Sequence, residues 1–388
     1  MISSATLLTA LFLSATSTAT VLPPRVAAVN PVVSGTPQVL GVVSDPTLDR
    51  DSCGSSLIGG RVLWACRDTE PVGSDGIPTL PVISSTASWS DLDSSGLPVL
   101  DGSTYPMYGN NNEEPFYPLQ ADECDDNSAG GCSDGTRYAI WPDTPPLVTN
   151  TAADGTVTAY TWIRKAHITD SLTDLAPDPD TSLYKVVYSP SAAHDALPAV
   201  TIVDEAFWAA DEQVPYGAYG SIVSADGSTA YLYGKGSSGT IALAKVPVGS
   251  IEDKTQYQFY ENGSWTPTPP SLNASDINVP NASAGGQGTY FFSPPWERYV
   301  WIGQAGISVS ADFFVTTAPA PEGPWAAPVQ FYSAENGNAT LGAYSLQANP
   351  ALGGFEDGAN DVYLTYTKND VINGVGFYST PLIKVSWE

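Results

Sequence analysis

The sequence predicts an all-β protein folded as a five-bladed β-propeller. Short runs rich in β-forming residues recur along the chain between turn clusters, and no long stretch has a helical period. Gly and Pro, at 35 and 33 of 388 residues, agree with many short strands joined by turns. The strand-like runs lie at residues 39–43, 61–66, 156–163, 182–188, 229–233, 240–246, 288–292, 298–302, 310–316, 361–366 and 380–385.

The later half of the chain repeats a unit of three runs. Units begin at Tyr216, Gly288 and Gly342, and each holds a small or aromatic run, a turn, an aromatic run and a third run. The period is roughly 60 residues, which leaves room for about five units. A propeller buries its faces between neighbouring blades, while a β-sandwich is the alternative. The run at 39–43 can pair with the last unit and close the ring.

Charge excludes several function classes. The chain has 14 Lys+Arg against 41 Asp+Glu, a net charge of −27. Such a surface repels phosphate backbones and anionic membranes, so we expect no nucleic-acid and no membrane partner. A neutral polysaccharide is indifferent to this charge, whereas an anionic one such as pectate is repelled. Only His167 and His194 are histidines, and neither has a partner motif, so carboxylates are the expected catalysts.

The N-terminus predicts export. Residues 1–19 hold a short apolar run followed by small residues and read as a signal peptide, with a disordered N-terminus as the alternative. Residues 20–36 form a loose lead-in and 37–388 a single propeller domain. N-glycosylation sequons stand at Asn262, Asn273, Asn281 and Asn338. We therefore expect a secreted, extracellular, monomeric glycoprotein.

The four cysteines fit two disulfides in an exported chain. Gly59-Gly60 is a two-residue hairpin turn signal that pairs Ile58 with Arg61. The same register brings Cys53 opposite Cys66 and Asp51 opposite Asp68. Facing Cβ atoms lie roughly 4.5–5.5 Å apart, so a Cys53–Cys66 bridge needs the closer type of pairing. Cys124 and Cys132 make the second pair.

Asp51 and Asp68 are the candidate catalytic residues. Strand alternation would place both on one face, and mutual repulsion would raise the pKa of one of them. An acid and a base made from two carboxylates are what glycoside hydrolysis requires. The alternative is that each Asp caps a turn.

The first hairpin resembles the opening blade of a known family. Arg50-Asp51-Ser52-Cys53-Gly54, Gly59-Gly60-Arg61, Leu63-Trp64 and Asp68-Thr69 look like the secreted propellers called domain of unknown function 4185, some of them endo-D-arabinanases of glycoside hydrolase family 183. Looser matches are Tyr216 to Ser221, Gly323-Pro324-Trp325 and Asn349-Pro350. The resemblance implies a five-bladed propeller with its active site at the channel mouth and Asp51 and Asp68 as acid and base. The chain departs where the family often has Gly-Gly, at Ser52-Cys53, and where Gly is common, at Arg67.

Other residues are weaker candidates. Trp141, Tyr216 and Tyr219 can line a sugar-stacking cleft, although aromatic residues in strands are more often core. Arg67 can contact substrate but fits an ion pair better, on the face opposite Asp68, and Asn349 fits a turn equally well. The acidic residues Asp122, Glu123, Asp125 and Asp126, with Glu113 and Glu114 upstream, could hold Ca²⁺, but a solvated loop fixed by Cys124–Cys132 is favoured. We expect no other cofactor or metal.

The sequence thus predicts a secreted glycoside hydrolase, an endo-acting furanosidase similar to D-arabinanases, with a polysaccharide as substrate. A non-catalytic carbohydrate-binding or cell-surface propeller is the alternative, and an extracellular structural glycoprotein is a third interpretation. Fold analogy does not separate them.

Overall fold

The fold is built almost entirely of β-strands. A computed structural model describes residues 29, 31–109, 114–124, 130–353 and 360–388. Helix in these residues is confined to three short 3₁₀ turns, η1 (Val248–Ser250), η2 (Lys254–Gln256) and η3 (Pro350–Leu352). None of these turns is long or apolar enough to cross a membrane. The all-β prediction is confirmed, whereas the predicted signal peptide lies outside the described residues.

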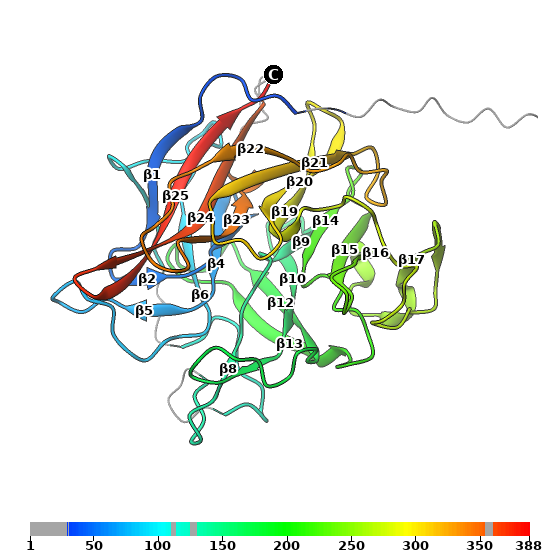
Figure 1. Cartoon of the computed structure of the whole chain (residues 1–388), viewed down its shortest axis with the longest axis horizontal. Coiled ribbons are helices and arrows are strands. Elements are labelled where there is room, and N and C mark those ends of the chain that lie inside the picture. The colour runs from blue at the N-terminus through cyan, green and yellow to red at the C-terminus, as the bar shows by residue number, and fades with distance from the viewer. Residues whose placement is uncertain (1–28, 30, 110–113, 125–129, 354–359) are drawn as a thin grey trace, which may run out of the picture.

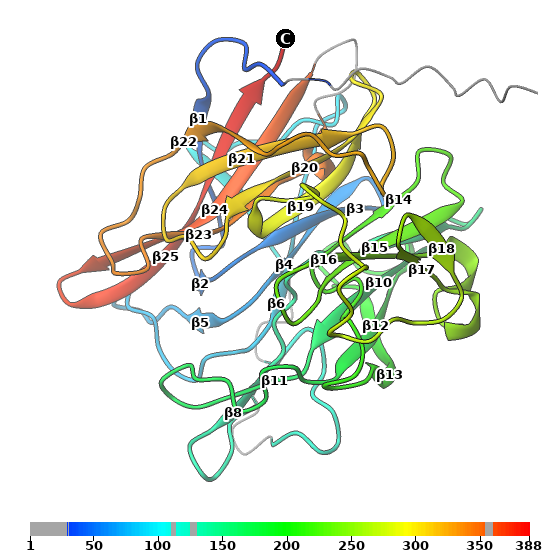
Figure 2. The same ribbon diagram turned by 45° about the vertical axis from the view of Figure 1, so that its right-hand side comes forward.

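Five sheets form the blades of a propeller (Figures 1 and 2). Blade 1 is β3 (Gly54–Ile58), β4 (Arg61–Cys66) and β6 (Thr86–Ser90). Blade 2 is β9 (Leu147–Thr151), β10 (Val157–Arg164), β12 (Thr181–Tyr188) and β13 (Ala199–Trp208). Blade 3 is β14 (Gly220–Val223), β15 (Thr229–Lys235), β16 (Ile241–Pro247), β17 (Gln258–Glu261) and β18 (Ser264–Thr266). The predicted unit that begins at Tyr216 is this blade, although Tyr216 itself precedes β14.

The last two blades complete the ring. Blade 4 is β19 (Gly285–Ser293), β20 (Arg298–Ala305), β21 (Asp312–Ala318) and β22 (Val329–Ser333). Blade 5 is β23 (Ala343–Ala348), β24 (Asp361–Ile372), β25 (Val375–Ser386), β1 (Gln38–Ser44) and β7 (Thr104–Pro106). Two-stranded pairs lie beside the blades: β2 (Leu48–Arg50) with β5 (Thr69–Pro71), and β8 (Arg137–Ala139) with β11 (Ala166–Ile168).

The N-terminal strand closes the ring. β1 pairs antiparallel with β25, from Gln38 opposite Lys384 to Val43 opposite Thr380, and the two strands lie side by side in Figures 1 and 2. This confirms that the run at 39–43 joins the last unit. Closure removes the open sheet edges that an unclosed array would expose.

Hydrophobic side chains fill the space between neighbouring blades. One cluster joins Trp162 and Leu183 of blade 2 to Leu232 and Phe259 of blade 3. Another joins blades 4 and 5, with Val300 and Leu364 fully buried. Removing such side chains from water is the main favourable contribution to folding, about 1.5–3 kcal/mol for each large one.

The first hairpin has the predicted register. Gly59 and Gly60 both have positive φ, 60° and 77°, which the mirror-image two-residue turn requires and which Gly adopts without strain. Ile58 pairs with Arg61 and Gly54 with Ala65. Both predicted disulfides are confirmed: Cys53–Cys66, with Cα atoms 4.0 Å apart, and Cys124–Cys132.

Candidate active site

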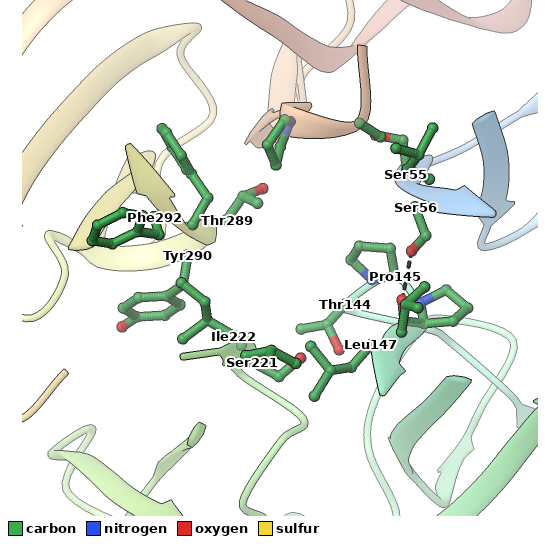
Figure 3. Close-up of a pocket in the computed structure, with 18 of the residues that line it drawn as sticks. Ser55, Ser56, Thr144, Pro145, Leu147, Ser221, Ile222, Thr289, Tyr290 and Phe292 are labelled. Carbon is green, nitrogen blue, oxygen red and sulfur yellow. Dashed lines mark hydrogen bonds between the residues drawn. The ribbon is translucent and has the colours of Figure 1, made fainter. Parts of the chain in front are cut away.

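A channel runs between the inner strands of the blades. Its cavity has a volume of about 340 Å³. It is lined by β3, β14, β19 and η3, and by the segment that leads into β9. Figure 3 shows Ser55 and Ser56, Thr144 and Leu147, Ser221 and Ile222, and Thr289 ringed around the open centre. Within the part of the chain that the structure describes, the lining is small, hydroxylic or apolar and holds no Asp, Glu, His, Lys or Arg, so the charged groups lie outside this cavity.

Those groups gather at the mouth of the channel, where each blade's inner strand begins. Asp51 stands just before β3, Asp143 before β9 and Tyr219 directly before β14, while Gln287 and Tyr344 lie near the starts of β19 and β23. All five side chains are half-buried. Each blade therefore contributes one polar side chain to the cluster or to the pocket that adjoins it.

Arg67, just after β4, connects this cluster. Its guanidinium forms an ion pair with Asp143 and donates a hydrogen bond to Gln287 Oε1 at 2.9 Å. The charges of Asp143, Asp51 and Asp68 all act on it and hold its pKa above the ordinary arginine value, although burial opposes them. The favoured prediction of an ion pair for Arg67 is thus confirmed.

The predicted face of Arg67 is wrong. Regular pairing in the hairpin stops at Gly54. Beyond it, two residues of one strand, Arg67 and Asp68, lie opposite the single residue Asp51. The Arg67 amide donates to the Asp51 carbonyl, and the Asp51 amide donates to the Asp68 carbonyl. Such a two-against-one bulge re-aims side chains. Ser52, with φ of 49°, breaks the other strand. Arg67 therefore shares the site with both acids, contrary to simple alternation.

Ser52 holds the Asp51 carboxyl. Its hydroxyl donates to Asp51 Oδ1 at 2.5 Å, and the Thr367 hydroxyl of β24 donates to the same oxygen at 3.1 Å. The left-handed backbone at Ser52 is one that Gly adopts without strain. Ser52 thus adds a hydrogen bond to Asp51 at a position whose backbone conformation favours Gly.

Burial raises the pKa of Asp51 above its ordinary value, and the charge of Asp68 adds to this effect. The charge of Arg67 and the hydrogen bonds from Ser52 and Thr367 lower it without cancelling the rise. The Tyr344 hydroxyl, within hydrogen-bonding reach of Asp51, has its own pKa raised by burial. Asp51 thus holds a proton to higher pH than an exposed Asp does.

Asp68 is held by different partners. Arg137 of β8 binds it with both nitrogens, Nη1 to Oδ1 at 2.9 Å and Nη2 to Oδ2 at 2.5 Å, and Trp141 Nε1 donates to Oδ1 at 2.8 Å. A carboxylate has about four acceptor positions, so one on Oδ2 is left open. Trp141, predicted to stack on sugar, positions Asp68 through its ring nitrogen.

The remaining candidates divide between site and scaffold. Tyr216 is 1% exposed and packs against Trp208 and Phe259, so it is a core residue and the cleft-lining prediction is wrong for it. Asn349 is fully buried, with Ser55 Oγ donating to its Oδ1 and its own amide donating to Thr365. It directly precedes the 3₁₀ turn η3, and a turn role was the alternative. Tyr219 lines a pocket beside the channel mouth.

The other predictions concern the surface. Lys165 binds both oxygens of Asp122, and Glu123 accepts from the Gln120 amide, while Glu113, Asp125 and Asp126 lie outside the described residues, so Ca²⁺ binding stays a prediction. His167 stacks on Tyr138 and His194 on Tyr108. The four sequon residues, Asn262, Asn273, Asn281 and Asn338, are exposed, as glycosylation requires.

Sequence reasoning missed Asp143, Gln287, Tyr344 and Arg137. Asp143 offered one signal, because it stands just before the inner strand of blade 2 as Asp51 does in blade 1. Gln287 and Tyr344 lie inside strands where nothing local distinguishes them. The hairpin register alone could find only the two acids of blade 1.

Comparison with known proteins shows the fold. No family model matches the chain, and no curated protein matches its sequence. A Bacteroides ovatus protein proposed to be a hydrolase is similar in structure, with a TM-score of 0.56, 14% identity, and coverage of 87% of this chain and 85% of that one. Weaker likenesses are to a protein from Bifidobacterium bifidum proposed to be an exo-β-1,3-galactanase (TM-score 0.44, 12% identity, 87% and 88% covered) and to an exo-1,5-α-L-arabinanase from a bovine ruminal metagenomic library (TM-score 0.43, 12% identity, 88% and 94% covered).

Asp49, close to the site, gives a testable pH dependence of stability. It is 6% exposed, its carboxyl accepts from the Tyr378 amide, and burial raises its pKa to about 7. Between about pH 4 and 7 the folded protein therefore holds a proton that the unfolded chain has released, so the free energy of unfolding falls as pH rises, by up to about 4 kcal/mol.

Asp49→Asn removes this loss while keeping an oxygen for the Tyr378 amide. We expect the variant to melt a few degrees above wild type at pH 8 and to have no such advantage at pH 4. Thermal unfolding of both proteins at the two pH values measures it. An advantage that is the same at both pH values would contradict the raised pKa.

Proposed function

We propose that the protein is a secreted glycoside hydrolase whose active site is the channel mouth. The observation that carries the proposal is the pair of carboxyls in the first hairpin: Asp51 is buried with a raised pKa, and Asp68 is held in an ion pair with one acceptor position open. Two carboxyl groups in contrasting environments are suited to acid and base roles. The similar fold of a proposed hydrolase and the two disulfides support this assignment.

The roles follow from the environments. Asp51, which holds its proton to higher pH, donates it to the oxygen of the glycosidic bond that breaks. Asp68, fixed by Arg137 and Trp141, uses its open acceptor position either to take a proton from water or to attack the sugar carbon. Arg67 and Tyr344 orient and tune Asp51 from two other sides. The hydrolysis needs no group beyond these side chains and water.

The finer proposal is an endo-acting furanosidase similar to D-arabinanases. It rests on the resemblance of the first hairpin to the family of domain of unknown function 4185, which the positive φ of Ser52 supports. The test is a panel of polysaccharides that includes D-arabinan and fungal and plant cell-wall polymers, with product release measured by chromatography. Cleavage of a polymer within its chain is expected, and a protein that cleaves nothing but retains ligands on a glycan array is a binding propeller.

A further inference from the structure

A second pocket opens beside the channel mouth. It has a volume of about 390 Å³, within the range of small-molecule sites, and shares Arg67, Asp143 and Gln287 with the cluster around Asp51. Its other walls are blade 2 at Arg164 and blade 3 at Lys235. A molecule in this pocket therefore lies against Arg67, whose charge acts on the proposed catalytic acid Asp51.

The pocket is positively charged in a strongly negative protein. Arg67, Arg164 and Lys235 line it, three of only 14 cationic residues in the chain, against the carboxylates Asp143 and Asp178. The net lining charge is +1, whereas the whole chain carries −27. Cations that are scarce elsewhere are concentrated here.

Two of these cations have no carboxylate partner. Among the described residues, no Asp or Glu oxygen lies within 4.0 Å of Lys235 Nζ or of the Arg164 guanidinium. Lys235 Nζ donates to the Gly285 carbonyl at 2.6 Å and lies 4.5 Å from the centre of the Tyr219 ring. Arg164 donates to the Pro177 carbonyl. Both retain donors, since an ammonium has three and a guanidinium five.

Holding the charge of Lys235 costs the free protein stability. Lys235 is half-buried, and burial lowers its pKa below the ordinary lysine value, which shows that its environment disfavours the charged form. The neighbouring Arg164 lowers it further, and only the Asp143 charge opposes this. An anion that enters the pocket would compensate both cations and form charge-assisted hydrogen bonds with them.

We infer that this pocket binds a sugar unit with one negative charge, the carboxylate of a uronic acid or a sulfate ester, next to Asp51. The choice of a sugar and its place in catalysis rest on the proposed function, whereas the binding of an anion does not. A single negative charge matches the net charge of the lining. Where both proposals hold, the substrate is a polysaccharide that carries an anionic unit beside the bond that is cleaved, which an unsubstituted D-arabinan does not.

This inference refines what the net charge implies. The field of −27 repels a polyanion at long range, but at physiological ionic strength it is screened over about 8 Å. At contact the nearest charges dominate, and here the three cations Arg67, Arg164 and Lys235 outnumber the two carboxylates of the lining. The chain-wide charge therefore slows the approach of an acidic glycan without forbidding its binding.

The test measures binding of sodium glucuronate, sodium galacturonate, galactose 6-sulfate, glucose and galactose by NMR titration or calorimetry. We expect an anionic sugar to bind at least tenfold more tightly than its neutral counterpart. Comparing the affinities of the two uronates with that of galactose 6-sulfate shows whether the pocket prefers a carboxylate or a sulfate ester. Lys235→Met should reduce that affinity at least tenfold and leave neutral sugars unaffected. Acetate and inorganic sulfate are controls for charge without sugar.

Lys245→Met is the matched control variant. Lys245 Nζ also lies over an aromatic ring, 4.1 Å from the centre of Trp265, in the same blade and outside the pocket. The Lys245→Met variant should bind anionic sugars as tightly as the wild-type protein does. Arg164→Gln is the second variant in the pocket, and thermal melting shows that each variant is folded.

Equal binding of anionic and neutral sugars, or unchanged affinity in both Lys235→Met and Arg164→Gln, would overturn the inference. Acetate or sulfate that binds as tightly as the anionic sugar would overturn it too. A protein that binds the uronate but cleaves no glycan upholds the inference and refutes the hydrolase proposal. Cleavage of a neutral glycan with no binding of anionic sugars supports the hydrolase proposal and refutes this inference.

Discussion

Asp51→Asn is expected to lower kcat about a thousandfold or more on any glycan that the wild-type protein cleaves. Asn has the shape of Asp and still accepts hydrogen bonds from Ser52 and Thr367, but it has no acidic proton to give to the departing oxygen. A loss of general-acid catalysis of about 10²–10⁴-fold, with the added loss of charge, accounts for this size. Rates from reducing-end release, with melting temperatures beside them, measure it.

The matched control is Asp93→Asn, in the same part of the chain. Asp93 is exposed and accepts from the Ser95 and Leu97 amides in a turn, a role that Asn also fills. Full activity in this variant shows that an Asp-to-Asn change in blade 1 is harmless by itself. A folded Asp51→Asn protein with more than a tenth of wild-type activity would refute Asp51 as the acid.

A substrate with a good leaving group distinguishes the role of Asp51 from that of Asp68. A nitrophenyl glycoside has a departing group that needs little protonation, so an acid variant regains activity on it while a base or nucleophile variant does not. Asp51→Asn should therefore recover on this substrate, and Asp68→Asn should remain inactive. Asp68→Asn also leaves Arg137 without its two-point partner, so a lower melting temperature is expected for it alone.

The fold was largely predictable because its signals are local. Strand alternation and turn clusters identified most strands, the repeat from Tyr216 onward identified the last three blades, and the pattern at 39–43 identified the closing strand. The Gly59-Gly60 turn was sufficient to place both cysteines and the backbones of both acids. A propeller is a case in which short-range patterns add up to the whole architecture.

The site was predictable only in part because it is not local. Arg67 was placed on the wrong face, since strand alternation holds only while pairing is regular and the bulge opposite Asp51 breaks it. Tyr216 and Tyr219 look alike in sequence, yet one is core and the other lines a pocket. Asp143, Gln287 and Lys235 meet Arg67 only through closure of the ring, which no neighbouring residues encode.

Arg67 is the residue through which these distant parts of the chain act on Asp51. Its positive charge is the strongest influence that lowers the Asp51 pKa, so Arg67→Met should raise that pKa further above its ordinary value. If Asp51 is the acid, its deprotonation sets the alkaline limb of the kcat/KM profile, and that limb should move to higher pH. The optimum rate should also fall at least tenfold, because Asp143 loses its ion-pair partner and Arg67 no longer stabilises the charge that forms on Asp51 when it gives up its proton.

The double variant Arg67→Met with Asp143→Asn tests whether the effects of Arg67→Met come from the unpaired Asp143 carboxylate or from the lost charge near Asp51. It removes the carboxylate that loses its partner in the single variant, so the melting temperature should recover in part. The ion pair is partly buried, so we expect the recovery to correspond to about 1–2 kcal/mol. The alkaline limb should stay at the shifted position of the single variant, because the Arg67 charge that lowers the Asp51 pKa is still missing. Rates measured across pH for wild type and both variants decide it. An alkaline limb that stays in place or moves to lower pH in Arg67→Met would mean that Asp51 does not supply the proton.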